Sequence, residues 1–306
     1  MGNMVVRTLG LAVLLACFGC GGGGVGSNEG GTREIAFQSA PVDEVPIALS
    51  TQDLQGRTDG VTNFVRVYPS NAVVRVAAPE TFHGLPFYRW VWDGGSADAQ
   101  VFSVPTDRVS GLTAVYGDGC TFEPNYTNDL DRLLHWQRMP VKIYLAIDRN
   151  ATQGAIEAAR TGFGWWNGRL GGVVRWSEVS TPSSADVIVR WRDDLGRNLL
   201  GYTQYTYEVS SGRLLSAEIV IRSGLEGQDG EAIAAHELGH ALGVGGHSSL
   251  HADLMYSTYT GFNMNEVTLR DANTVRTGHC HLFGGGRSTG SPGGATATSR
   301  IVCPSN

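Results

Sequence analysis

The stretch HELGHALGVGGHSSLHADLMY, residues 236–256, contains four histidines, one glutamate and one methionine. His236 and His240 are four residues apart, so on a helix they lie on one face about one turn apart. Two imidazoles at this spacing can hold one Zn²⁺ ion, and Glu237 beside them can move protons without binding the metal. This HExxH pattern predicts a catalytic zinc site on a helix.

The neighbouring glycines favour this interpretation over a helix with solvated histidines. Gly239 is small where the helix must pack closely against another element. Gly243 can adopt the left-handed conformation that ends a helix, so the chain can turn back and present a third ligand.

The chain upstream of the motif shows strand and helix patterns. Alternating apolar residues predict strands at 140–147 (PVKIYLAI), 173–179 (VVRWSEV), 185–191 (ADVIVRW) and 216–222 (SAEIVIR). Residues 150–167 carry apolar side chains at helical spacing, the motif helix starts near Asp229, and a last helix covers residues 265–279. Together these elements predict a mixed α/β domain at residues 120–283.

The rest of the chain divides by composition. Short alternating runs bounded by Gly, Pro, Asn or Asp predict a small all-β module at residues 51–118, which resembles immunoglobulin-like or internalin-type surface repeats. Its role as a spacer is favoured over partner binding. Residues 18–50 are glycine-rich and then polar, which predicts a flexible linker. Residues 284–306 are rich in Gly, Ser and Thr, which predicts a flexible tail.

Residues 1–17 predict export. A single positive charge, Arg7, precedes an apolar run from Leu9 to Ala16, which is too short to span a bilayer. The sequence LLAC ending at Cys17 resembles a bacterial lipobox, which predicts a lipid on Cys17. Cys20 is a second candidate, and cleavage followed by free secretion is the alternative. The protein is therefore expected at the cell surface or outer membrane, held to the membrane by its lipid, or secreted.

Export places the later cysteines in an oxidising compartment, where disulfides persist. Three cysteines follow the signal region: Cys120, Cys280 and Cys303. Because three is an odd number, the simple arrangement is one disulfide and one free thiol. A Cys120–Cys280 pair is favoured because these residues bracket the predicted catalytic segment. A Cys280–Cys303 pair is the alternative.

The charge pattern excludes one class of partner. The 306 residues carry a formal net charge of −6, and the basic residues are scattered. The sequence therefore lacks the basic stripe that nucleic-acid binding requires. A monomer is expected.

The segments HELGHALG, GHSS and LMY, read in order, resemble the metzincin metalloproteases, and among them the matrixin branch that includes the matrix metalloproteinases. The similarity covers roughly residues 120–282, with strands and helices in the order that this family uses. It implies a metzincin-type α+β catalytic domain with a mixed, mostly parallel sheet and an active-site helix. It also implies catalytic Zn²⁺, and Met255 matches the methionine of the turn beneath the zinc.

The sequence departs from the family at the third zinc ligand. The family pattern HExxHxxGxxH places that ligand at position 246, where this chain has Gly246, and the next histidine is His247. Gly245 and Gly246 tolerate unusual backbone angles, so a one-residue bulge would still bring His247 to the metal. His247 is therefore the expected third ligand, and His251 is the alternative.

The resemblance also implies where substrate binds. Matrixin substrates lie extended and antiparallel along an edge strand, which by position would be residues 216–222, with Ile219 and Ile221. Tyr256 and Tyr259 match the wall of the pocket for the side chain after the cut.

These features predict a zinc-dependent endopeptidase that hydrolyses peptide bonds of extracellular proteins or peptides. A zinc-bound water is the expected nucleophile and Glu237 the general base. Structural Ca²⁺, common in the family, is a further expectation, with Asp193 and Asp194 as contributors. Two alternatives stay open: a catalytically inactive surface adhesin, which the retention of Glu237 disfavours, and a peptidase of cell-wall peptides.

Overall fold

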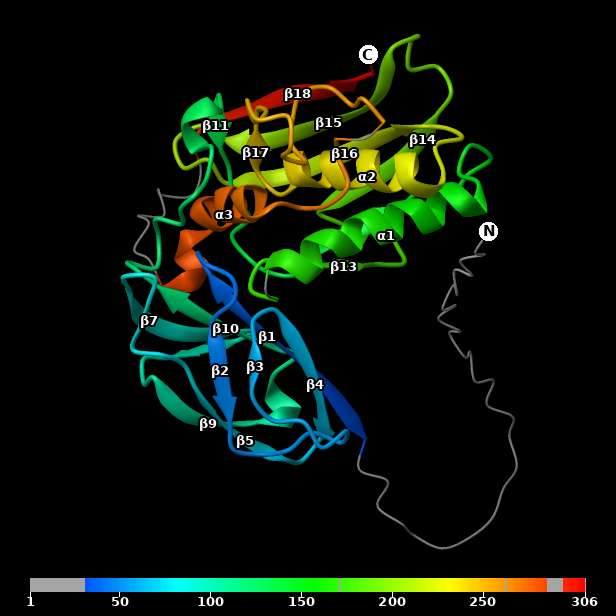
Figure 1. The fold of residues 1–306 in the computed structure, drawn as a ribbon. Coiled ribbons are helices and arrows are strands. Elements are labelled where there is room, and N and C mark those ends of the chain that lie inside the picture. The colour runs from blue at the N-terminus through cyan, green and yellow to red at the C-terminus, as the bar shows by residue number, and fades with distance from the viewer. Residues whose placement is uncertain (1–30, 171, 262, 285–293, 306) are drawn as a thin grey trace, which may run out of the picture. The chain divides into compact units, whose positions relative to one another are not determined.

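Short β-strands make up the first part of the described chain (Figure 1). The structure, a computed structural model, describes residues 31–170, 172–261, 263–284 and 294–305. The strands of the first part are β1 (Thr32–Ala40), β2 (Pro46–Leu49), β3 (Gly60–Val61), β4 (Phe64–Pro69), β5 (Val73–Ala77), β6 (Thr81–Phe82), β7 (Leu85–Trp92), β8 (Gly95–Ala97), β9 (Val101–Pro105) and β10 (Gly111–Tyr116). Their side chains alternate as in half-buried sheets: Val74 and Val76 of β5 are buried, whereas Val73 and Arg75 are exposed.

These strands form two sheets with a hydrophobic core of their own. The first sheet has the order β4-β1-β10-β7-β6, with β8 paired to β7, and the second has the order β3-β2-β5-β9. Ile35, Phe37 and Trp90 are fully buried in this core. The expectation of a flexible linker at residues 18–50 is wrong for β1 and β2. Strand β1 is ordered because it pairs on both sides, antiparallel with β4 and parallel with β10.

A further, mixed sheet lies beside the predicted metal-binding helix. Its strands are β12 (Val141–Leu145), β13 (Trp176–Glu178), β14 (Val187–Arg192), β15 (Leu199–Glu208), β16 (Leu214–Arg222) and β18 (Thr296–Pro304). The order is β13-β12-β14-β16-β15-β18; the first four are parallel, and β15 is antiparallel to both of its neighbours. Strands β11 (Arg132–Leu133) and β17 (Val244–Gly245) form a separate antiparallel pair.

Two expectations about this sheet are wrong. Residues 216–222 lie in β16 as predicted, but β16 is an interior strand that pairs with β14 on one side and β15 on the other. Residues 296–304, expected within a flexible tail, form β18 and pair antiparallel with β15. Strand β18 has little local hydrophobic pattern, so its order depends on a partner that lies far away in the sequence.

Three α-helices of the described chain share a hydrophobic core with this sheet: α1 (Gln153–Leu170), α2 (Gly227–Ala241) and α3 (Leu269–Gly278) (Figure 1). Helix α1 begins after Thr152, whose hydroxyl accepts a first-turn backbone N–H at 3.1 Å. Helix α3 begins with a capping box, in which Thr268 and Asp271 each accept the other's backbone N–H. Helices α1 and α2 approach closely, because a Cβ added to Gly162 would lie 2.1 Å from the Glu231 carbonyl oxygen. The 3-10 turns are Thr106–Arg108, Thr127–Asp129, Pro182–Ser184 and Cys280–Phe283.

Buried contacts join the strand-rich part to the part that contains the mixed sheet. The second core holds Trp166 and Trp191, and it also includes Ala40, Val91 and Val115 from the first part. The polar contacts at this boundary are Gln38 to the Gly168 carbonyl at 2.9 Å, Asn273 to the Pro41 carbonyl at 3.0 Å, Arg169 with Asp43 at 3.0 Å and Arg175 with Asp93 at 2.6 Å. The described residues from Gly31 onward accordingly cluster as one unit. These contacts therefore hold the strand-rich part against the part that contains the mixed sheet.

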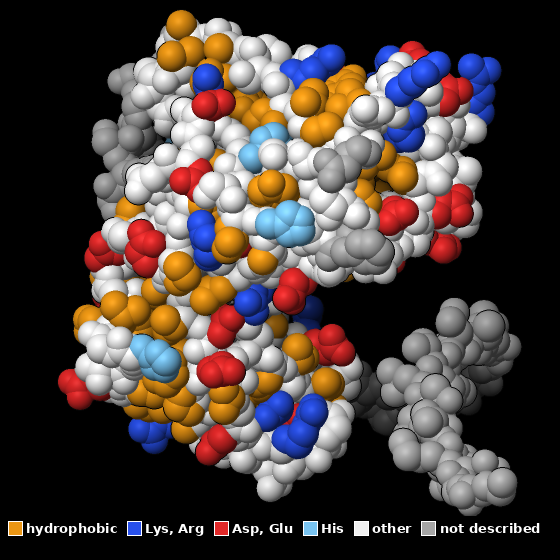
Figure 2. All heavy atoms as spheres, turned by 45° about the horizontal axis from the view of Figure 1, so that its top comes forward, with side chains coloured by type: hydrophobic (Ala, Val, Ile, Leu, Met, Phe, Trp, Pro, Cys, Tyr) orange, Lys and Arg blue, Asp and Glu red, His pale blue; other side chains and the backbone are white. Residues whose placement is uncertain are grey.

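Charges of both signs are mixed on the face drawn in Figure 2, with apolar patches between them. Within the described ranges, no helix has the length and apolar character needed to cross a membrane. The predicted signal segment, with Cys17 and Cys20, lies outside the described residues.

A disulfide joins Cys120, just after the strand-rich part, to Cys280 at the end of α3. The third cysteine of the described chain, Cys303, is a buried free thiol. The two linked residues are 160 positions apart, so the bond closes a long loop that contains the three helices and every strand of the mixed sheet except β18.

Replacing Cys120 and Cys280 together by serine should lower the free energy of unfolding by about 2–5 kcal/mol, because the crosslink restricts the unfolded chain over a long loop. Urea unfolding of the variant and the wild type measures this difference. A reducing agent should destabilise the wild type and leave the double variant unchanged. Equal stability of the two proteins would contradict the pairing.

Two glycines of α1 should respond oppositely to the same substitution. Gly162→Ala should cost about 1–3 kcal/mol, because its Cβ would collide with the backbone of α2. Gly164→Ala should stabilise the protein by about 0.5–1 kcal/mol, because nothing lies within 4 Å of its added Cβ and alanine favours the helix. Thermal or urea unfolding distinguishes the two, and a loss of similar size at both positions would refute the close approach of the helices.

Candidate metal centre

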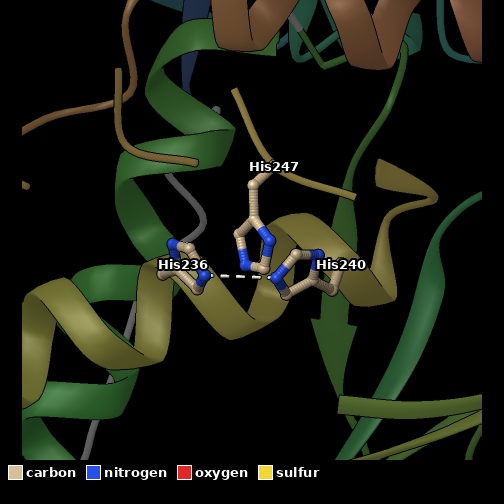
Figure 3. Close-up of side chains that lie close together, drawn as sticks. All are labelled: His236, His240 and His247. Atoms are coloured by element: carbon tan, nitrogen blue, oxygen red, sulfur yellow. Dashed lines mark hydrogen bonds between the residues drawn. The ribbon is translucent and has the colours of Figure 1, made fainter. Parts of the chain in front are cut away.

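Helix α2 presents two histidines toward a loop that returns over it. His236 and His240 are one helical turn apart, and both are 0% exposed. Their Nε2 atoms lie 3.1 Å from each other. His247 enters from the loop after β17, and Figure 3 shows the three rings turned toward a common point. One ring nitrogen from each histidine lies within 4.8 Å of the other two.

The loop accommodates its extra residue at two glycines. Gly246 has a φ of +152°, which residues with a side chain rarely adopt, and a Cβ at Gly245 would lie 2.5 Å from the Arg132 carbonyl oxygen. With glycine at both positions, the backbone brings His247 to the cluster. The alternative ligand, His251, is exposed and packs its ring against Tyr256, with centroids 5.1 Å apart.

The hydrogen bonds of the rings show that the cluster fits a metal ion. His236 Nδ1 lies 2.8 Å from the Leu254 carbonyl oxygen, and His240 Nδ1 lies 2.8 Å from that of Val244. A carbonyl oxygen only accepts, so both Nδ1 atoms carry the hydrogen and both Nε2 atoms present lone pairs. These two lone pairs face each other, and neither atom can donate to the other.

A cation resolves this conflict. Nitrogens bound at 2.0–2.1 Å to a tetrahedral ion lie about 3.3 Å apart, close to the observed 3.1 Å. His247 Nε2 is also buried, with no hydrogen-bond partner among the described residues. Three imidazoles with available lone pairs form the donor set expected of zinc.

Burial keeps the three rings neutral. It lowers the pKa of His236 to about 3, with a smaller contribution from His247. It also holds the pKa of His240 well below its usual value, with smaller contributions from His236 and then His247. Burial also lowers the pKa of His247, which Asp131 partly opposes. Neutral imidazole is the form that binds metal, so protons do not compete for these nitrogens near neutral pH.

Met255 forms the floor of the cluster. It is fully buried, and a Cβ at Gly239 would lie 2.3 Å from its Sδ, so this turn packs directly on α2 between the two histidines. Asp271 at the start of α3 holds the turn, accepting from the Leu254 N–H at 2.9 Å and the Met255 N–H at 3.3 Å. The same turn supplies the carbonyl that orients His236.

Glu237 lies beside the cluster and is fully buried. Thr203 of β15 donates its hydroxyl hydrogen to Glu237 Oε2 at 2.6 Å, and Oε1 has no partner within the described residues. Burial raises the pKa of Glu237 to about 8, against the effect of the Thr203 hydrogen bond. A cation held by the imidazoles would lower this pKa. One oxygen therefore anchors the carboxyl group, and the other is available for proton transfer.

The expected substrate contacts separate into two groups. Ile219 and Ile221 do not lie at an edge, because the backbone of β16 is paired on both sides and both side chains are buried in the core. They cannot offer main-chain hydrogen bonds to a peptide, which corrects the expectation from sequence. Tyr256 and Tyr259 lie in the loop after the Met255 turn, where the Tyr259 hydroxyl donates to Asp229 at 2.5 Å. Their contact with substrate stays a prediction.

The expected calcium contributors lie away from this cluster. Asp193 and Asp194 are exposed in the loop between β14 and β15. In the described part of the chain, neither belongs to a group of three potential metal ligands. Calcium binding stays a prediction.

Three residues near this site are not among those expected from the sequence: Thr203, Asp271 and Cys303. The Cys303 thiol sulfur lies within 4.8 Å of a His236 nitrogen and a Glu237 carboxylate oxygen. Thr203 and Cys303 reach the site through the pairing of distant strands, which no local pattern indicates. Asp271 was detectable, because it follows Thr268 at the spacing of a capping box.

Comparison with known proteins agrees with this geometry. Residues 216–279 match the family model described as Matrixin. The match covers about a fifth of the chain and spans most of β16, all of α2, the three histidines, the Met255 turn and α3. It supports a matrixin-like metalloprotease domain, with which the mixed sheet and helices are compatible. A search of curated proteins finds no matching relative.

Two histidine variants test the third ligand. His247→Ala should weaken zinc binding by at least about 100-fold, since loss of a mere outer-shell partner already costs 10–100-fold. His251→Ala is the matched control and should bind zinc like the wild type. Metal analysis and competition with a chelator measure both. If His251→Ala lost zinc and His247→Ala kept it, His251 would be the third ligand.

Proposed function

We propose that the protein is a zinc-dependent endopeptidase that acts on extracellular proteins or peptides. The observation that carries this proposal is the convergence of three imidazole lone pairs next to a carboxyl group with one free oxygen. The matrixin match supports a zinc metallopeptidase. Endopeptidase cleavage and action on extracellular substrates go beyond this match and are our proposal.

His236, His240 and His247 would hold the zinc ion. Three nitrogen ligands leave one position open, as catalytic sites require. When bound, zinc acts as a Lewis acid on the scissile carbonyl and lowers the pKa of water.

Glu237 performs the proton transfers. Its free Oε1 takes a proton from the attacking water and then returns one to the leaving amine nitrogen. Thr203 fixes the other oxygen at 2.6 Å, so the carboxyl group keeps its orientation through both steps. A nucleophilic side chain is not needed in this sequence of steps.

The substrate main chain would bind along β15, on the side that β18 occupies in this structure. This side lies next to Glu237, because Thr203 belongs to β15. An extended peptide can add to a sheet edge through main-chain hydrogen bonds, which gives affinity with little demand on sequence. Tyr256 and Tyr259 would then line the pocket for the side chain after the cut.

We place this activity outside the cytoplasm, on a lipid anchor at Cys17 or in secreted form. Support comes from the signal-like residues 1–17 and from the disulfide between Cys120 and Cys280, which is typical of oxidising compartments. Residues 120–283 would form the protease domain. The preceding strands would form a β module that is fixed to it.

Glu237→Gln should lower the rate of casein hydrolysis by about 10²–10⁴-fold while zinc stays bound, because it removes proton transfer and leaves the imidazoles in place. Glu231→Gln, on the same helix, is the matched control and should cleave at the wild-type rate. Metal analysis and a chelator complete the experiment. Full activity of Glu237→Gln would exclude the proposed role, and activity that persists without zinc would exclude the proposed chemistry.

A further inference from the structure

Strand β18 lies along β15 in the place proposed for the substrate main chain (Figure 1). It pairs antiparallel with β15 from Thr296, opposite Glu208, to Pro304, opposite Leu199. An extended peptide that added to β15 on this side would use the same backbone groups. A segment of the chain itself thus occupies the position of a peptide substrate.

The end of this segment is held from two sides. The Tyr259 N–H donates to the Pro304 carbonyl oxygen at 3.1 Å, and the Ser305 N–H donates to the Asn198 carbonyl oxygen at 2.9 Å. Asn198 directly precedes β15, and Tyr259 belongs to the loop proposed to line the pocket for the side chain after the cut. Pro304 and Ser305 therefore run between β15 and the wall of that pocket.

The register of β18 brings the backbone around Cys303 next to Glu237. Cys303 lies opposite Gly201, and a Cβ added to Gly201 would lie 2.8 Å from Glu237 Oε1. The Cys303 sulfur is within 4.8 Å of a Glu237 carboxylate oxygen and a His236 nitrogen. Glu237 Oε1 is buried and has no hydrogen-bond partner within the described residues. The backbone of Cys303 thus lies beside the carboxyl group that is available for proton transfer.

Of the two peptide bonds that flank Cys303, the first is in the better position for cleavage. The Cys303 side chain is fully buried, whereas Val302 is 41% exposed and Pro304 is half-buried. A cut before Cys303 makes this buried side chain the one that fills the pocket after the cut. A cut after Cys303 would place Pro304 there, and the leaving nitrogen would be crowded by the proline ring.

We propose that the protein cleaves its own chain between Val302 and Cys303. One water molecule adds to the Val302 carbonyl carbon, and Glu237 takes a proton from it. Glu237 then passes the proton to the Cys303 nitrogen as the carbon–nitrogen bond breaks. The products are a carboxylate at Val302 and a tetrapeptide, CPSN, with a free amine. No oxidant or reductant takes part. This inference rests on the proposed function, because the same site performs the reaction.

The bound segment also indicates which side chains the site accepts directly after the cut. Cys303 behaves as a small apolar residue, and it is fully buried beside His236 and Glu237. A packed interior does not take up much extra volume without strain. The site therefore accepts small side chains such as cysteine and alanine at this position and disfavours large aromatic ones.

The cut is tested by intact mass spectrometry of the full chain, purified with a chelator and then given Zn²⁺. The wild type and the control Glu231→Gln should lose the mass of residues 303–306, whereas Glu237→Gln should keep it. The first-order rate constant should not depend on protein concentration, because each chain cuts its own strand. A different cleavage point, or a cut that persists in Glu237→Gln, overturns the proposal.

The position of the strand is tested without any cleavage, by hydrogen exchange in Glu237→Gln. The Tyr259 amide should exchange slowly there, because it donates to the Pro304 carbonyl oxygen. In the wild type, exchange of this amide should become faster once residues 303–306 have been released. An unprotected Tyr259 amide in the uncut variant overturns the proposed binding of the segment.

Substitutions on either side of the cut test the small pocket. Cys303→Ala should be cut at about the wild-type rate, and Cys303→Trp at least about tenfold more slowly. Val302→Trp is the matched control, because Val302 is exposed, and it should be cut like the wild type. Synthetic peptides with the sequence of residues 296–306 and the same substitutions at position 303 should show the same order when added to the cut wild type. Equal rates for the alanine and tryptophan peptides overturn the small pocket, and this result needs no variant to fold.

Failure of this inference differs from failure of the proposed function. A zinc-loaded wild type that hydrolyses casein and keeps residues 303–306 overturns the self-cleavage and leaves the proposed function standing. A wild type that removes residues 303–306 and hydrolyses no added protein or peptide supports the self-cleavage and overturns the proposed action on external substrates. If the zinc-loaded protein cuts neither casein nor its own chain, both fall.

Discussion

The arrangement of the site depends on two imidazole lone pairs held 3.1 Å apart inside the protein. Each ring is fixed because its Nδ1–H donates to a carbonyl oxygen, that of Leu254 for His236 and that of Val244 for His240. Buried polar groups need partners, so neither ring can turn away without losing its hydrogen bond. The segments after α2 must therefore lie where they do, and the charge of a metal ion is what makes the facing lone pairs tolerable.

A second layer of polar contacts holds those segments in place. Asp271 accepts from two backbone N–H groups of the Met255 turn and from the Tyr126 hydroxyl, the last at 2.8 Å. Burial raises the pKa of Asp271, and the Thr268 and Tyr126 hydrogen bonds oppose this. The chain of contacts from Asp271 through the turn to His236 thus links α3 to the metal centre. Such outer contacts set the orientation of metal ligands as much as the helix that carries them.

Local patterns in the sequence predict the part of this site that a single element determines. The spacing of His236 and His240 needs only the period of a helix, and the freedom of Gly246 is enough to bring His247 back to it. No local sequence pattern indicates the order of the strands within a sheet. The alternation that identifies β16 is the same for an edge and an interior strand, so it does not reveal that Ile219 and Ile221 lie in an interior strand. Strands β1 and β18 look like linker and tail because their order depends on distant partners.

The position of β18 also follows from how a sheet edge binds peptides. An edge that recognises main chain with little sequence demand accepts any extended segment, including one from the same chain. A tethered segment competes at an effective concentration that can reach the millimolar range, so it occupies such an edge ahead of most external peptides. Pairing also shields the backbone groups of β15 from edge-to-edge association.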